Sequence, residues 1–91
     1  NLQNPTNEKG KNVLVIGLGY VGLTFAIHCC EKQYNVYGIE INQHILSSLN
    51  SNKAHFLEPG IDELITKYKG KSFFCSDFFS PVVIRRFSFV C

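Results

Sequence analysis

The sequence predicts an α/β fold built on a parallel sheet of about four strands with helices beside it. Short apolar runs alternate along the chain with segments whose apolar residues recur at helical spacing, and a cluster of glycines separates the first run from the segment after it. Strands that alternate with helices are most simply joined by right-handed crossovers, which place the strands parallel. The 91 residues, 45% of them hydrophobic, leave room for one small packed domain.

The N-terminal half predicts a strand, a helix and a second strand. Residues 1–10 are polar and show no period, so we expect a flexible N-terminal extension there. The apolar run at 12–17 predicts a buried strand, and residues 20–32 predict the helix that follows it. Residues 34–40 carry Val36 and Ile39 and predict the next strand.

Two more helices are predicted by the spacing of apolar residues. Asn42 is a candidate N-cap for a helix whose apolar face includes Ile45 and Leu49. The second helix covers residues 61–68, with acids in its first turn and lysines at its end, and Gly70 follows as its C′ residue.

The C-terminal part predicts two strands, over residues 72–76 and 87–91. Between them Pro81 suits the first position of a helix over 80–86, although the β-branched residues of that segment favour an extended backbone.

The glycines form the pattern G-x-G-x-x-G at the predicted turn from strand to helix, with Gly17, Gly19 and Gly22 as its members. In a dinucleotide site the first glycine permits the tight turn, the second removes a Cβ that would block the pyrophosphate, and the third lets the helix pack closely. The N-terminus of the helix beyond them then presents free backbone N–H groups to the phosphates. We therefore expect a Rossmann-type dinucleotide-binding site.

Within this hypothesis, Glu40 indicates which dinucleotide the site binds. It ends the second predicted strand, eighteen residues after Gly22. An acid at about this distance accepts hydrogen bonds from the ribose hydroxyls of the adenosine and repels a 2′-phosphate. Because Ile41 follows and no Arg stands beside Glu40, we expect NAD rather than NADP. The alternative is a tight turn without a ligand and a solvated carboxylate at a strand end.

Charge and cysteine content argue against several other classes of protein. A net charge of +2 is far from the basic surface that nucleic acids or acidic membranes require. Cys29 and Cys30 are adjacent while Cys75 and Cys91 lie far downstream, so the four cysteines lack the spacing of a metal site. Free cysteines of this kind suit the core of a cytoplasmic protein.

A membrane helix is the competing interpretation of residues 13–30, which contain no charged residue. The glycines near the first third of this run, with β-branched residues before them, instead predict a buried strand that turns into a buried helix.

Three segments together resemble the N-terminal domain of the UDP-glucose/GDP-mannose dehydrogenase family. They are IGLGYVGLTFAI at 16–27, YGIEIN at 37–42 and NKAHFLEPGIDELI at 52–65. The pattern E-P-G-[I/L]-x-E-L in the third is the most specific of their motifs. The resemblance covers residues 11–77, and Thr24 stands where many members have proline.

The resemblance implies an NAD-dependent oxidoreductase of polysaccharide biosynthesis that oxidises the C6 hydroxyl of a UDP- or GDP-sugar to a uronate. In the family the nucleophilic cysteine belongs to a later motif that none of the four cysteines matches. We therefore expect no catalytic or metal-binding residue here, and residues 11–91 as a partial dinucleotide-binding domain, inactive alone as a fragment. The six expected cofactor-binding residues are Gly17, Gly19, Tyr20, Val21, Gly22 and Glu40.

Two interpretations remain open beside this one. The chain could be a stand-alone dinucleotide-binding or regulatory module without catalysis. Glu58-Pro59-Gly60 could serve an active site, although Pro-Gly is also a plain turn into the next helix.

The sequence predicts no functional site at the three histidines. We expect His28, His44 and His55 to be structural or exposed, because no partner stands at a recognisable spacing from them.

Overall fold

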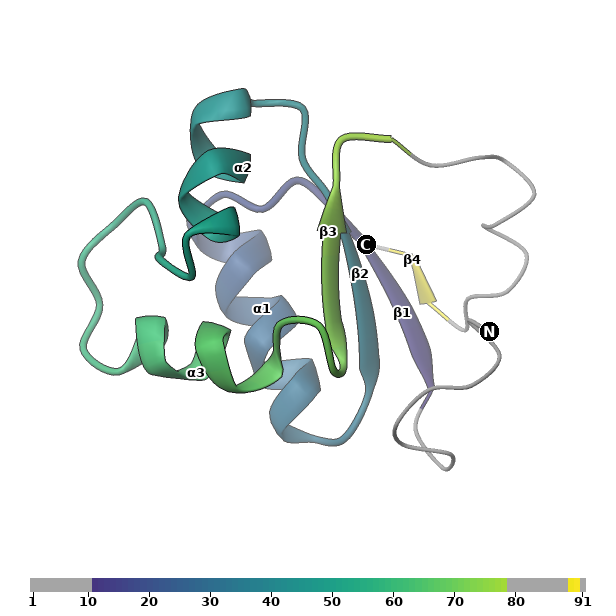
Figure 1. The fold of residues 1–91 in the computed structure, drawn as a ribbon. Coiled ribbons are helices and arrows are strands. Elements are labelled where there is room, and N and C mark those ends of the chain that lie inside the picture. Colours follow the sequence, from purple (N-terminus) through teal and green to yellow (C-terminus); the bar gives the residue numbers. More distant parts are fainter. Residues whose placement is uncertain (1–10, 79–88, 91) are drawn as a thin grey trace.

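The fold is a parallel sheet with helices packed on it (Figure 1). The computed structural model describes residues 11–78 and 89–90. Along the chain its elements are β1 (Asn12–Ile16), α1 (Tyr20–Glu31), β2 (Asn35–Ile39), α2 (Gln43–Asn50), α3 (Ile61–Tyr68), β3 (Phe73–Ser76) and β4 (Phe89–Val90). The strands lie in the order β3-β2-β1-β4 and every pair is parallel, which confirms the predicted fold class.

The predicted elements differ from the observed ones by a few residues at their ends. The first strand stops at Ile16 because Gly17 takes a positive φ of 94°, and α1 ends at Glu31, shortly before Gln33 with a φ of 72°. Gly70 has a φ of 84° just beyond α3, as expected of a C′ residue. The helix predicted over 80–86 lies outside the described residues, as do the ends of the strand predicted over 87–91.

The three labelled helices lie on the same side of the sheet (Figure 1). The core fills the space between this face of the sheet and the helices, and its apolar members come from every layer. They include Val13, Val15, Val36 and Phe73 of the sheet, Leu23, Ala26, Ile27 and Cys30 of α1, Leu49 of α2, and Ile61 and Ile65 of α3. This burial of apolar surface is the main source of stability of the fold.

The register of β1 and β2 sets the position of the predicted site. Ile16 pairs with Ile39 at the last step of the ladder, so the two strands end level with each other. The Gly17 amide continues the ladder by donating to the Ile39 carbonyl at 2.7 Å, and the Glu40 amide donates to the carbonyl of Ser76 at 2.9 Å. The glycine turn and Glu40 therefore meet at the carboxyl edge of the sheet.

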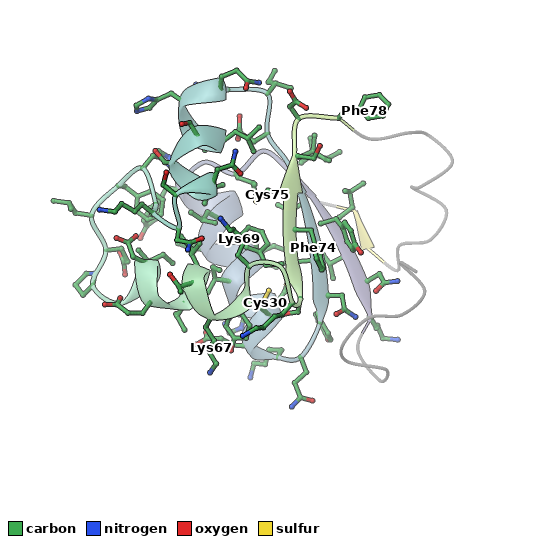
Figure 2. The ribbon with its side chains drawn as sticks, in the orientation of Figure 1. Cys30, Lys67, Lys69, Phe74, Cys75 and Phe78 are labelled. Carbon is green, nitrogen blue, oxygen red and sulfur yellow. The ribbon has the colours of Figure 1, made fainter. Side chains whose placement is uncertain are left out.

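Side chains form hydrogen bonds with free backbone groups at both ends of α2. Asn42 caps the start, because its Oδ1 accepts from the amides of His44 and Ile45. Lys69, which follows α3, reaches the other end, where its Nζ donates to the carbonyls of Leu49 and Asn50 at 3.0 and 2.9 Å (Figure 2). A cation at a helix C-terminus also interacts favourably with the helix dipole.

Candidate dinucleotide-binding site

The three motif glycines have different surroundings. Gly17 makes the left-handed turn out of β1. A Cβ at Gly19 would meet open space, since nothing lies within 4 Å of it. A Cβ at Gly22 would overlap the backbone carbonyl oxygen of Gly17, so only glycine lets α1 approach the turn this closely. Gly19 thus leaves room for a ligand, whereas Gly22 serves the packing.

The N-terminus of α1 is open to solvent and to ligands. Gly19 is its N-cap residue, and within the described residues no side chain caps this end and no acid stands in its first turn. Tyr20 and Val21 are 57% and 76% exposed. The first amides of a helix have no partner inside the helix, so this end can donate hydrogen bonds to an anion.

The Glu40 carboxylate lies beside the glycine turn and is buried, with 7% of the residue exposed. Its Oε1 accepts from the Leu18 amide at 2.6 Å, and its Oε2 accepts from the Asn42 amide at 2.8 Å. The alternative of a solvated carboxylate at a strand end is therefore wrong. Each carboxylate oxygen has a second lone pair, so further donors such as ribose hydroxyls can still be accepted.

Sequence reasoning missed the pair formed by Leu18 and Gly38. The Leu18 side chain is completely buried, and a Cβ on Gly38 of β2 would come within 2.7 Å of Leu18 Cδ1. Gly38 thus makes room for Leu18, which holds the glycine turn down on the sheet. A glycine inside a predicted strand is the signal from which such a close approach could have been predicted.

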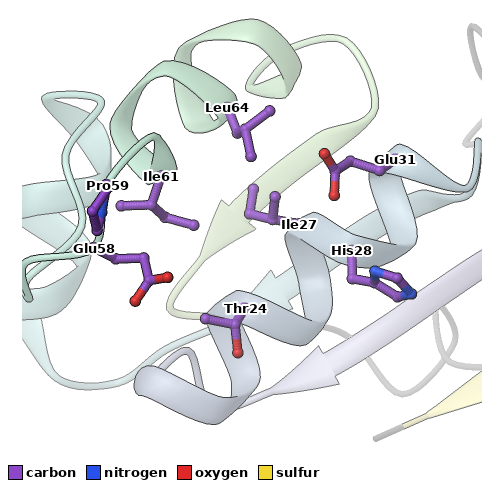
Figure 3. Close-up of a pocket in the computed structure, with 8 residues that line it drawn as sticks. All are labelled: Thr24, Ile27, His28, Glu31, Glu58, Pro59, Ile61 and Leu64. Carbon is purple, nitrogen blue, oxygen red and sulfur yellow. The ribbon is translucent and has the colours of Figure 1, made fainter.

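A groove of about 210 Å³ lies between α1 and the start of α3 (Figure 3), and none of the six predicted cofactor residues lines it. Glu58 and Pro59 line it, and Gly60 beyond them has a φ of 84°. The Ile61 amide donates to the Glu58 carbonyl at 3.1 Å, so this segment forms a turn that leads into α3. His28 also lines the groove and is exposed.

The described cysteines are core residues. Cys29 and Cys30 of α1 are buried and Cys75 of β3 is partly buried. Figure 2 shows Cys30 and Cys75. Burial raises the pKa of the Cys30 thiol to about 12, so this thiol stays protonated at neutral pH. Within residues 11–78 no group of three or more His, Cys, Asp or Glu side chains is arranged to hold a metal ion. Cys91 lies outside the described residues.

None of the described helices combines the length and the apolar character that crossing a membrane requires. The uncharged run at 13–30 is divided between β1 and α1, as its glycines predicted.

Comparison with known sequences finds nucleotide-sugar dehydrogenases among the relatives of this chain. UDP-N-acetyl-D-mannosamine dehydrogenase of Campylobacter jejuni is 45% identical over 53 residues, which are 58% of this chain and 13% of that enzyme. UDP-glucose 6-dehydrogenase of Haloferax volcanii is 41% identical over 56 residues, 62% of this chain and again 13% of the enzyme. The chain therefore spans about an eighth of the length of these curated relatives.

Solved structures agree with the sequence comparison. UDP-D-ManNAc dehydrogenase from Pyrococcus horikoshii superposes with a TM-score of 0.67 at 29% identity, over 88% of this chain and 19% of that chain. GDP-mannose dehydrogenase from Pseudomonas aeruginosa, at 24% identity, shares the fold with a TM-score of 0.71 over 87% of this chain and 19% of its own.

The family model that matches the chain describes the NAD-binding domain of these enzymes, and the match takes in residues 11–91. The protein therefore belongs to the UDP-glucose/GDP-mannose dehydrogenase family, as part of its NAD-binding domain.

Proposed function

We propose that the protein supplies the NAD site of a nucleotide-sugar 6-dehydrogenase, which oxidises a UDP- or GDP-sugar to its uronate. The observation that carries this proposal is the Glu40 carboxylate, held by two backbone amides beside the glycine turn. NAD, when bound, accepts hydride from the sugar. Residues 11–91 act as the dinucleotide-binding domain, and residues 1–10 as an extension before it.

The turn fits the phosphates of a dinucleotide. Open space at Gly19 and the uncapped start of α1 support a pyrophosphate bound to the amides of Tyr20 and Val21. Gly17 makes the turn, and Gly22 keeps the helix start close to it. Binding of this kind requires no basic side chain.

Glu40 supports NAD as the cofactor. Two amides fix the orientation of its carboxylate, so its remaining lone pairs are directed before a ribose arrives. A 2′-phosphate would bring two negative charges next to this buried carboxylate, and repulsion at short range in a poorly solvated place is strong. Exposed Ile41 beside it offers an apolar surface to the adenosine.

The sugar chemistry belongs in this proposal to other parts of such an enzyme. We assign no catalytic role to the described side chains: Cys29 and Cys30 are buried in the core, the Cys30 thiol is held protonated, and Glu58 belongs to a turn. Buried free thiols, an NAD site and a nucleotide-sugar substrate all suit the cytoplasm, where thiols stay reduced.

Calorimetric titration of the purified protein with NAD and NADP tests the cofactor. We expect NAD to bind and NADP to bind at least about tenfold more weakly, and Gly19→Val to abolish NAD binding by filling the phosphate space. Unchanged NAD affinity in Gly19→Val would remove the site assignment. Reduction of NAD by this protein with UDP-glucose, UDP-N-acetylmannosamine or GDP-mannose would show instead that the chain carries the chemistry itself.

A further inference from the structure

The first turn of α1 has to keep its shape without a cap. Its N-cap residue is Gly19, and among the described residues no side chain accepts a hydrogen bond from its amides. Helix ends commonly fray, and no side-chain cap from the described part of the chain restrains this one. The proposed function, on which this inference rests, nevertheless needs the amides of Tyr20 and Val21 to be fixed in space.

A ring from another part of the chain contacts this turn. Phe56 lies between α2 and α3, and its ring meets the ring of Tyr20 edge to face, with the centroids 4.9 Å apart and the planes at 67°. Phe56 is partly buried against the core, whereas Tyr20 is 57% exposed. The Phe56 ring, which packs against the core, therefore restrains the exposed Tyr20 ring.

The segment that carries Phe56 is itself anchored on both sides. The Lys53 amide donates to the Ser48 carbonyl of α2 at 2.9 Å. The Ala54 amide donates to Oδ1 of Asp62, in the first turn of α3, also at 2.9 Å. The ring of His55 packs edge to face on Phe56, with centroids 4.8 Å apart. These contacts give Phe56 a defined position relative to both neighbouring helices.

We infer that Phe56 is a positioning residue of the dinucleotide site. Its ring holds Tyr20, and through Tyr20 the first turn of α1, in the helical conformation whose amides bind the phosphates. A ligand that binds a preformed turn does not have to order it first. Edge-to-face pairs of this kind correspond to roughly three- to tenfold in an equilibrium constant, so this is the loss of NAD affinity expected when the pair is broken.

A double-mutant cycle tests whether Phe56 acts through Tyr20. Phe56→Leu and Tyr20→Leu should each weaken NAD binding by roughly three- to tenfold. The double variant should bind NAD no more weakly than whichever single variant has the lower NAD affinity. Phe56→Tyr keeps the edge-to-face ring and should retain the affinity. ADP-ribose, which has the pyrophosphate, should bind Phe56→Leu more weakly than the unmodified protein, as NAD does. Adenosine, which has no phosphate, should bind the two proteins equally in an NMR titration.

Leu57→Ala is the matched control, because Leu57 is the next residue and its side chain is fully exposed. The inference is wrong if Phe56→Leu binds NAD as tightly as the unmodified protein, if Leu57→Ala loses as much affinity, or if the two losses add in the double variant. Should Phe56→Leu fail to fold, Tyr20→Leu decides alone, and unchanged NAD affinity there overturns the inference. Gly19→Val separates the two proposals: if it still binds NAD, the assigned site itself is at fault.

Discussion

Glu40 and Leu18 are joined by a hydrogen bond of 2.6 Å, in which the Leu18 amide donates to the carboxylate. This bond links the end of β2 to the middle of the glycine turn. Leu18 also packs on the backbone at Gly38, so its amide and its side chain both attach the turn to the second strand. Glu40 thus shapes the turn, in addition to the ribose-binding role proposed for it.

Replacing Glu40 should therefore affect folding as well as binding. Glu40→Gln keeps the size of the side chain but places an amide NH₂ opposite one of two backbone donors. We expect the free energy of unfolding to fall by about 1–3 kcal/mol, because a buried donor loses its partner. Urea unfolding measures this change, and NAD affinity should fall in the same variant.

Glu31→Gln is the control for this substitution, since Glu31 is an exposed acid at the end of α1. It should change the stability by less than about 0.5 kcal/mol. Equal stability of Glu40→Gln and the unmodified protein would mean that the two amides do not depend on the carboxylate.

Gly19 and Gly22 should respond differently when each is changed to alanine. Gly19→Ala has open space and a φ of −68°, so the fold should lose less than about 1 kcal/mol while NAD binding weakens strongly. Gly22→Ala places its Cβ on the Gly17 carbonyl oxygen and should cost about 1–3 kcal/mol of stability. Thermal unfolding and NAD titration of both variants check this, and a folding defect in Gly19→Ala larger than in Gly22→Ala would contradict it.

Local patterns accounted for most of the fold. The apolar runs and helical spacings predicted the described strands and helices to within a few residues, because these elements follow the periodicity of their own side chains. The cap at Asn42 and the left-handed Gly70 were also predictable, since each depends only on residues a few positions away.

Contacts between distant segments were not predictable in the same way. The pattern indicated a ribose-binding acid at Glu40, but its burial against the Leu18 amide depends on how two strand ends meet. The Phe56 ring on Tyr20 and the Lys69 ammonium on α2 likewise follow from where a loop and a helix end are placed by the packing. Sequence periodicity carries no information about such pairs.

Lys69 should stabilise the fold through the carbonyls at the end of α2. Lys69→Met keeps the aliphatic stem but removes the two hydrogen bonds from Nζ to Leu49 and Asn50. We expect a loss of about 1–2 kcal/mol in the free energy of unfolding. Lys53→Met is the matched control, because Lys53 is an exposed lysine, and it should cost less than about 0.5 kcal/mol. Equal effects of the two substitutions in urea unfolding would refute the capping role.

Cys30 should make the protein less stable at high pH. Burial raises the pKa of its thiol from 9.0 to about 12, so between these values the folded protein keeps a proton that the unfolded chain loses. The contribution of this thiol to the free energy of unfolding is therefore fully present below about pH 9. It is lost as the pH rises towards 12, with a slope of at most about 1.4 kcal/mol per pH unit.

Cys30→Ala tests this contribution. The variant loses packing and the bond from Sγ to the Ser72 carbonyl at every pH, but it has no thiol to titrate. Urea unfolding at about pH 7 and about pH 10 should therefore show a smaller decrease for Cys30→Ala than for the unmodified protein. The same decrease in both would mean that the thiol does not remain protonated in the folded state.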